Sequence, residues 1–358
     1  MTAPTPTEAA MRLALELAAL GPKGGPNPQV GCVILDAGGH LIAEGSHRGA
    51  GTPHAEVDAL SSLPAGRAAG ATVVVTLEPC NHTGRTGPCA VALIEAGVAR
   101  VVYAMRDPHA VASGGAERLR TAGVEVEEGL LAEEAAALNE RWVTAVRRGW
   151  PWVTVKWASS LDGRIAAVDG SSRWITGPAA REDVHRHRAE HGAVVVGTGT
   201  ALADDPALTA RNPDGTLQPV QPLPVVVGER DLPQDAAVRR HPRTPLHVRE
   251  HDPAAVLGSV LAAGATSVFV EGGPTLVSAF AAAGLVDEYL VYLAPSLLGG
   301  DRTATRDLGV ATVSDQLRLD LREVRTLGPD LLVVARPHPA GTPASVGRRR
   351  NGANPGKD

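Results

Sequence analysis

Hydrophobic and polar positions in the first third of the chain form two kinds of pattern. Residues 7–20 carry apolar side chains at helical spacing, with Thr7 as the expected N-cap of the helix. Continuous apolar runs at residues 30–35 and 71–75 predict buried strands, and residues 41–45 predict a strand that pairs with the first of them as a hairpin. The pattern therefore predicts a sheet with helices packed against it.

Two short helices are expected to begin at residues that could carry chemistry. His54 begins a helical run that extends to residue 60, and Cys89 opens a second run beyond Cys80 and the strand before it. A further strand is expected at residues 101–104. This alternation predicts a three-layer α/β/α domain with both helix starts at one edge of the sheet.

The second half of the chain repeats the α/β pattern after a helical connector. Residues 130–148 form this Ala-rich connector, and Pro151 opens a new strand at residues 152–156. We place the domain boundary near residue 149, which gives domains of residues 1–148 and 149–338. Residues 339–358 are rich in Pro, Gly, Ser and Arg, and we expect them to form a disordered tail.

Two turns of the second half could bind a phosphate group. A strand at residues 193–196 runs into a glycine turn at 197–200, and a strand at 267–270 ends in Glu271-Gly272-Gly273 before a helix start. Free backbone N–H groups and the helix dipole favour an anion at the second turn, although an ordinary strand–helix turn is the alternative. All five tryptophans lie between residues 142 and 174, and we expect them to pack around the domain junction and the start of the second domain, with Trp174 as a candidate for ligand contact.

Charge and composition limit the kinds of partner that we expect this protein to bind. The net charge of −5 argues against a general attraction to nucleic acid, and no apolar stretch approaches the roughly 20 residues of a membrane span. The N-terminus has no signal-peptide pattern. Three cysteines are consistent with a reducing cytoplasm rather than a disulfide framework. We therefore expect a cytoplasmic protein with a small-molecule substrate.

His54, Cys80 and Cys89 together predict a catalytic metal site. One imidazole and two thiolates suit tetrahedral Zn²⁺ with a fourth position open for water. Glu56 follows His54 by two residues and could move protons without binding the metal, which is the His-x-Glu…Pro-Cys…Cys signature of zinc deaminases. Cys32 lies in an apolar run and is interpreted as a buried strand residue, not a fourth ligand.

The spacing of the two cysteines distinguishes this chain from most cytidine-type deaminases. Eight residues separate Cys80 from Cys89, where two are usual, and Asn27-Pro28-x-Val30-Gly31 precedes them. With these motifs the chain resembles the bifunctional riboflavin-biosynthesis deaminase/reductase family over residues 8 to about 337. Similar motifs of the second half are Lys156-x-x-x-Ser160-Leu161-Asp162-Gly163, Ser172-x-Trp174-Ile175-Thr176, Ala203-Asp204-Asp205-Pro206-x-Leu208-Thr209 and Glu271-Gly272-Gly273.

The resemblance implies two reactions in one chain. The first is zinc-dependent hydrolytic deamination of diaminohydroxyphosphoribosylaminopyrimidine. The second is NADPH-dependent reduction of the ribose of 5-amino-6-(5-phosphoribosylamino)uracil to ribityl. It also implies a cytidine-deaminase-like domain followed by a dihydrofolate-reductase-like α/β domain, in a homodimer or homotetramer.

The resemblance further assigns residues at both sites. In the first domain Asn27, His47, His82 and Arg85 would hold substrate. In the second domain Lys156, Asp204 and Glu271 would arrange charge and protons. The implied NADPH contacts are Ala158, Trp174, Thr200, Asp204, Gly273, Pro274, Thr275, Leu276, Val277, Ser278 and Ala279. The implied substrate contacts are Ser172, Arg188, Leu208, Arg211 and Glu271.

Three departures from the family pattern leave alternatives open. The chain has Thr86-Gly87 for Thr-Pro, Asp107-Pro108-His109-Ala110 for Asp-Pro-Asn-Pro, and Gly228-Glu229 for Asp-Ser. Glu229 would repel a cofactor phosphate, so NADH in place of NADPH is one alternative. A catalytically lapsed reductase-like domain is another. A deaminase of nucleic-acid bases is a third, although residues 1–148 have few of the basic and aromatic side chains that it would need.

Overall fold

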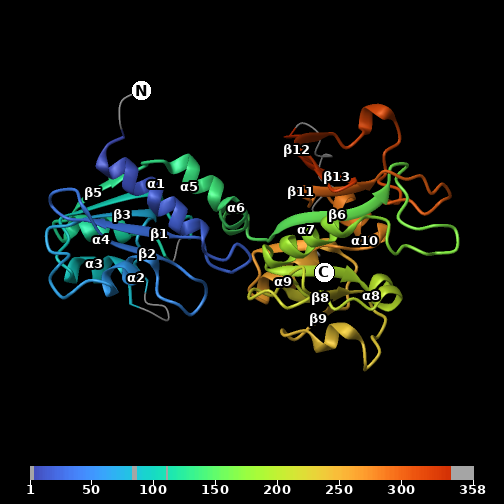
Figure 1. Ribbon diagram of the computed structural model, residues 1–358, viewed down its shortest axis with the longest axis horizontal. Coiled ribbons are helices and arrows are strands. Elements are labelled where there is room, and N and C mark those ends of the chain that lie inside the picture. Colours follow the sequence, from blue (N-terminus) through green and yellow to red (C-terminus); the bar gives the residue numbers. More distant parts are fainter. Residues whose placement is uncertain (1–3, 83–86, 110–111, 340–358) are drawn as a thin grey trace, which may run out of the picture.

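A computed structural model describes residues 4–82, 87–109 and 112–339 of the chain. Figure 1 shows two lobes, one built from α1 to α6 and β1 to β5, the other from β6 to β13 and their helices. The chain passes from one lobe to the other between α6 and β6. The predicted tail falls outside the described residues from 340 onward.

The N-terminal sheet has the strand order β2-β1-β3-β4-β5. β1 pairs antiparallel with both β2 and β3, whereas β4 and β5 extend the sheet in parallel. The strands are β1 (Gly31–Leu35), β2 (Leu41–Ser46), β3 (Thr72–Leu77), β4 (Arg100–Met105) and β5 (Glu125–Glu128). The predicted hairpin and the strands at 71–75 and 101–104 are confirmed, while β5 was not expected from the sequence.

Helices cover this sheet. They are α1 (Pro6–Ala19), α2 (Ala55–Ser61), α3 (Cys89–Glu95), α4 (Gly115–Thr121), α5 (Ala132–Leu138) and α6 (Glu140–Arg148). The prediction of Thr7 as the N-cap of α1 is wrong, because Thr5 accepts the hydrogen bond from the Glu8 N–H and Pro6 takes the first helical position. The predicted connector is two helices, which meet at Asn139.

Close packing brings α1 onto the centre of the sheet. A Cβ at Gly31 would lie 2.0 Å from the Ala14 carbonyl oxygen, so only glycine allows this approach. The core between the layers is aliphatic, with Cys32 fully buried in β1 as predicted. A rigid sheet edge therefore supports the turns that carry His54, Cys80 and Cys89.

The C-terminal sheet has the strand order β12-β13-β11-β6-β10-β7-β8-β9. The central strands run parallel, and β13 and β12 close one edge in antiparallel pairing. The strands are β6 (Trp152–Ser160), β7 (Ala193–Gly197), β8 (Leu223–Val227), β9 (Leu246–Val248), β10 (Ser267–Val270), β11 (Glu288–Ala294), β12 (Leu319–Leu327) and β13 (Asp330–Pro337). The α-helices are α7 (Pro178–Ala189), α8 (Thr198–Asp204), α9 (Pro253–Ala262) and α10 (Pro274–Ala282), with 3₁₀ turns η1 (Ala237–Arg240) and η2 (Val313–Asp315).

The predicted packing at the start of the second domain holds for the two tryptophans on β6, and the others are divided between the N-terminal core and the surface. Trp152 is buried and Trp157 packs on the C-terminal core, whereas Trp142 packs on the N-terminal core. Trp150 and Trp174 are 41% and 70% exposed. Polar contacts join the lobes, as described below for α6 and the loop before Asn27. Within the described residues, no helix combines the length and apolar character needed to cross a membrane.

Candidate active sites

The three predicted zinc ligands meet at the edge of the N-terminal sheet. His54 is the N-cap of α2, Cys80 follows β3 and Cys89 is the first residue of α3. His54 Nδ1 lies 3.2 Å from Cys89 Sγ and 3.5 Å from Cys80 Sγ, and all three donor atoms lie within 4.8 Å of one another. Tetrahedral Zn²⁺ places its nitrogen and sulfur ligands about 3.5 Å apart, so the arrangement fits this ion.

The surroundings of Cys80 and Glu56 shift the pKa values of both side chains. A hydrogen bond from Cys89, supported by His54, lowers the pKa of Cys80 to about 4. Burial raises the pKa of Glu56 to about 7, since the residue is only 3% exposed. Glu56 lies in the first turn of α2, directly after His54 and Ala55. A buried carboxyl beside the metal ligands is suited to carrying a proton.

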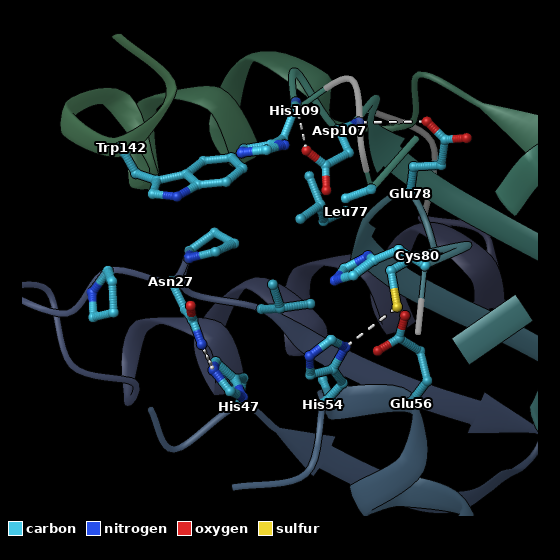
Figure 2. A pocket seen from close by; sticks show the side chains of 16 residues that line it. Asn27, His47, His54, Glu56, Leu77, Glu78, Cys80, Asp107, His109 and Trp142 are labelled. Carbon is cyan, nitrogen blue, oxygen red and sulfur yellow. Dashed lines mark hydrogen bonds between the residues drawn. The ribbon is translucent and has the colours of Figure 1, made fainter. Parts of the chain in front are cut away.

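A cavity of about 290 Å³ opens beside these ligands. Figure 2 shows His54, Glu56 and Cys80 together on one side of it. Asn27 and His47 lie along the same wall, where Asn27 Nδ2 is 2.9 Å from His47 Nε2. His82 also lines the cavity, and its buried Nδ1 has no hydrogen-bond partner in the described part of the chain. Arg85, the remaining predicted substrate residue, lies outside the described residues.

Four polar or aromatic residues that sequence reasoning did not assign to the site also line the cavity. Asp107 and His109 reach it from the loop after β4, so this departure from the family pattern is part of the site. Glu78 fixes that loop, since its carboxylate accepts hydrogen bonds from the Gly114 and Asp107 N–H groups. Trp142 comes from α6 and has no motif of its own. Only its place in the run of tryptophans could have drawn attention to it.

A second polar cluster lies in the C-terminal domain, where β6, β10 and α7 meet. Arg188 contacts both oxygens of Glu271, with Nε–Oε1 at 2.5 Å and NH2–Oε2 at 3.0 Å. Lys156 Nζ lies 4.0 Å from Glu271 Oε2. Burial lowers the pKa of Lys156, against the opposing effect of Glu271. Burial raises the pKa of Glu271, but Arg188 outweighs it, so the net shift is downward and the carboxylate stays charged.

The two predicted phosphate turns lie side by side. The Gly273 N–H donates to Thr200 Oγ1 at 3.2 Å, which joins the turn after β10 to the turn after β7. Gly273 is the N-cap of α10, and Pro274 and Thr275 follow at its accessible start. Leu276, Val277 and Ser278 are buried, and Ala279 is half-buried. The accessible part of this segment is therefore its first turn.

The remaining predicted residues of the C-terminal domain occupy four kinds of position. Arg211 Nε donates to Thr209 Oγ1, and Arg188 donates to the Thr209 carbonyl, so both arginines meet at this residue. Asp204 lies 3.6 Å from Arg173, which neighbours Trp174. The Leu208 side chain is 1% exposed and lies in the core. Ala158 and Ser172 are half-buried, on β6 and in the loop before α7.

Family models match both halves of the chain. The cytidine and deoxycytidylate deaminase zinc-binding region matches residues 4–105, and the RibD C-terminal domain matches residues 151–333. The riboflavin biosynthesis protein RibD of Mycobacterium tuberculosis is 52% identical over 310 residues, covering 86% of this chain and 90% of that protein. The chain belongs to the RibD family.

Other members match most of the chain. RibD of Escherichia coli K12 is 41% identical over 342 residues, covering 86% of this chain and 92% of that one. Acinetobacter baumannii RibD superposes with a TM-score of 0.86 at 38% identity, covering 93% and 99%. A Thermotoga maritima structure described as a diaminohydroxyphosphoribosylaminopyrimidine deaminase/5-amino-6-(5-phosphoribosylamino)uracil reductase gives 0.80 at 34% identity, with the same coverage.

This RibD family member is therefore a bifunctional riboflavin biosynthesis enzyme with a deaminase and a reductase domain. The predicted fold is confirmed: a cytidine-deaminase-like domain precedes the RibD C-terminal domain. The His54, Cys80 and Cys89 group fits Zn²⁺, and the reductase domain is consistent with NADPH.

Proposed function

We propose that the cavity of the N-terminal domain deaminates a diaminohydroxyphosphoribosylaminopyrimidine, the compound named for the Thermotoga maritima relative. The observation that carries this proposal is the convergence of three donor atoms within 4.8 Å beside the buried Glu56. In this proposal His54, Cys80 and Cys89 hold zinc, which activates a water molecule when it is bound. Glu56 would accept one proton from that water and pass it to the ring nitrogen. It would then take the second proton from the added hydroxyl and pass it to the amino group, which leaves as ammonia.

Polar residues along the cavity are assigned to the rest of this substrate. Asn27 and His47 are linked by a hydrogen bond and offer an amide and an imidazole to a polar ring edge. The unpartnered His82 Nδ1 offers a further polar atom. Arg85 is assigned to the phosphate on the family resemblance, because a guanidinium can bind phosphate through two hydrogen bonds.

For the C-terminal cluster we propose reduction of the ribose of 5-amino-6-(5-phosphoribosylamino)uracil. NADPH supplies the hydride when it is bound. Lys156 gives a proton to the sugar oxygen as the ring opens, and Glu271 holds Lys156 and Arg188 in place. Ring opening breaks the bond between the anomeric carbon and the ring oxygen, while the attached nitrogen forms a C=N bond to that carbon and releases its proton. Hydride addition to the carbon and return of a proton to the nitrogen then complete the ribityl group.

Binding residues are proposed from the same resemblance. Arg188 and Arg211, which meet at Thr209, are assigned to the substrate phosphate together with Ser172 and the backbone around Leu208. Thr200, Asp204, Trp174, Ala158 and the first turn of α10 are assigned to NADPH. The dipole and free N–H groups of α10 favour an anionic group at Gly273 and Pro274.

Organisation and location are also proposals. We assign the deaminase to residues 1–148 and the reductase to residues 149–338, since α6 ends at Arg148 and β6 begins at Trp152. We propose a homodimer or homotetramer, which light scattering of the purified enzyme would test. A cytoplasmic location suits the two thiolate ligands, because a reducing compartment keeps them free of disulfides.

Metal analysis beside an ammonia-release assay tests the deaminase assignment. Wild type should contain about one zinc per deaminase site, and Cys89→Ser should lose most of the metal and most of the ammonia release. Retention of both by Cys89→Ser would refute the assignment. Oxidation of NADPH with the deaminated intermediate tests the reductase, and its absence in the purified enzyme would favour a lapsed second domain.

A further inference from the structure

Trp142 lies across the deaminase cavity from the zinc ligands. It is half-buried on α6, where part of its side chain packs against the N-terminal core. Figure 2 shows its indole beside His109, on the wall opposite His54, Glu56 and Cys80. Among the lining residues that the structure describes, it supplies the one benzenoid ring.

The cavity is small, so a ring bound at the zinc ligands would also lie near the wall that carries Trp142. Its volume of about 290 Å³ is at the small end of the range for ligand pockets. A flat heteroaromatic ring that reaches His54 and Cys80 must therefore also approach the opposite wall. An aromatic side chain on that wall stabilises a bound base by stacking, and this contribution does not depend on a hydrogen bond.

The reductase domain holds the helix that carries Trp142. Glu140 pairs with Arg336 at 2.7 and 2.9 Å, and Arg141 lies 3.6 Å from Glu288. These contacts reach β13 and β11 from the two residues directly before Trp142. On the other side, Asn139 is buried and bonds both backbone groups of Gln29, at 2.7 and 2.9 Å, close to Asn27.

We propose that Trp142 is a substrate-positioning residue of the deaminase site, and that the reductase domain fixes it in place through Glu140 and Arg141. This inference rests on the proposed deaminase function of the cavity. Trp142 packs against the pyrimidine ring while the ring's amino-bearing carbon lies at the zinc end. The two domains then share one binding site in addition to sharing a chain.

Steady-state kinetics of ammonia release test the role of the indole. Trp142→Leu keeps an apolar side chain but removes the ring, and the KM for deamination should rise roughly 5- to 150-fold, the range measured for loss of base stacking. Zinc content and the reductase KM should stay unchanged. Trp142→Phe should recover most of the lost affinity, and Trp150→Leu, on an exposed tryptophan outside the cavity, is the matched control.

Fluorescence gives a second readout that does not depend on turnover. In a Glu56→Gln background the pyrimidine substrate should bind without reacting, and it should quench tryptophan emission. Adding Trp142→Phe to that background should remove most of the quenching. Quenching that survives Trp142→Phe, or a KM for Trp142→Leu equal to that of wild type, would overturn the proposal.

Two variants of Glu140 test whether the reductase domain holds Trp142 in place. Glu140→Arg places a second positive charge next to Arg336 and should raise the deaminase KM, as Trp142→Leu does. Glu140→Asp keeps the negative charge, and its deaminase KM should stay close to that of wild type. An unchanged KM for Glu140→Arg would refute the role of the reductase domain. If Glu56→Gln retained full ammonia release, the deaminase assignment itself would fail, whatever the Trp142 variants show.

Discussion

Arg188 and Glu271 form an ion pair with two contacts, at 2.5 and 3.0 Å, in the C-terminal domain. Lys156 lies 4.0 Å from the same carboxylate, so two cations share one anion at a largely buried position. Such a cluster retains a net positive charge and attracts a phosphorylated substrate. It also makes Glu271 the residue on which the placement of both cations depends.

Replacing Glu271 by Gln should abolish most of the reductase activity. The change leaves Arg188 and Lys156 without a buried counter-charge, and both side chains should move. We expect the reductase kcat/KM to fall roughly 100-fold, the usual scale for loss of a positioned acid–base group. Loss of NADPH absorbance measures this effect, with Glu250→Gln at an exposed site as control. A variant that also loses ammonia release would indicate general misfolding instead.

The preference for NADPH should depend on Arg230 as well as on Glu229. Glu229 is exposed at the end of β8, but the Arg230 guanidinium lies near Gly199, where an added Cβ would be 3.2 Å from it. This places a cation beside the turn that Thr200 joins to Gly273. Arg230→Gln should raise the KM for NADPH roughly tenfold, the scale of one lost charge-assisted hydrogen bond, with little change for NADH. Glu229→Gln should lower the KM for NADPH, and Arg147→Gln should change neither.

Local patterns made much of the fold predictable. Strands such as β3 and β10 are continuous apolar runs, and both are buried in the structure. They could be predicted because a continuous apolar run indicates a buried segment. β5 was missed because its Glu-Val-Glu-Glu sequence is that of an exposed edge strand. It pairs through its backbone with β4, while Arg100 and Arg106 compensate its charges. Tertiary context overrides the propensity of such a strand.

The residues of the candidate sites likewise fall into two groups, those that short local motifs predict and those that only the tertiary structure brings together. His54, Glu56 and Cys80 could be found because their chemistry follows short local motifs. The Arg188–Glu271 pair joins residues 83 positions apart, and only the resemblance brought them together. Trp142 reaches the cavity because α6 is held between two domains, and its own neighbours in the sequence give no sign of this. Leu208 shows the opposite case, since a motif residue has its side chain in the core.

Removal of the metal should separate the two activities. A chelator should extract zinc from His54, Cys80 and Cys89 and abolish ammonia release, because the remaining residues cannot activate water by themselves. NADPH oxidation with the deaminated intermediate should persist, since the described contacts of the second cluster involve no metal ligand. Adding zinc back should restore deamination. Parallel loss of both activities on chelation would contradict separate sites.

Asp183 should account for part of the acid sensitivity of the C-terminal domain. Burial would raise its pKa, but hydrogen bonds from His187, Tyr292 and Arg186 outweigh this and lower the pKa well below 3.8. A carboxyl with a lowered folded pKa contributes its stability above the unfolded value and loses it as pH falls below that value. Asp183→Asn should therefore reduce the free energy of unfolding near pH 7 by roughly 2 kcal/mol.

Urea unfolding at a series of pH values measures this contribution. The difference between wild type and Asp183→Asn should shrink as pH falls below 3.8. Glu182→Gln, an exposed neighbour on α7, should match wild type throughout. A difference that stayed constant with pH would mean that packing, not the charge of Asp183, sets the effect.

Replacing Gly24 should weaken substrate binding at the deaminase site, because Gly24 lies in the loop that contacts the C-terminal domain. The loop before Asn27 docks on the C-terminal domain, where Lys23 pairs with Glu190 at 3.0 Å. A Cβ at Gly24 would lie 2.7 Å from the His191 carbonyl oxygen, and backbone cannot yield at that distance without moving the loop. Gly24→Ala should displace Asn27 and raise the KM for deamination roughly tenfold, because small shifts of a binding group carry large kinetic costs. At Gly25 the nearest atom to an added Cβ is 3.8 Å away, so Gly25→Ala should behave as wild type. Equal effects of the two variants would place the sensitivity in loop flexibility and not in the domain contact.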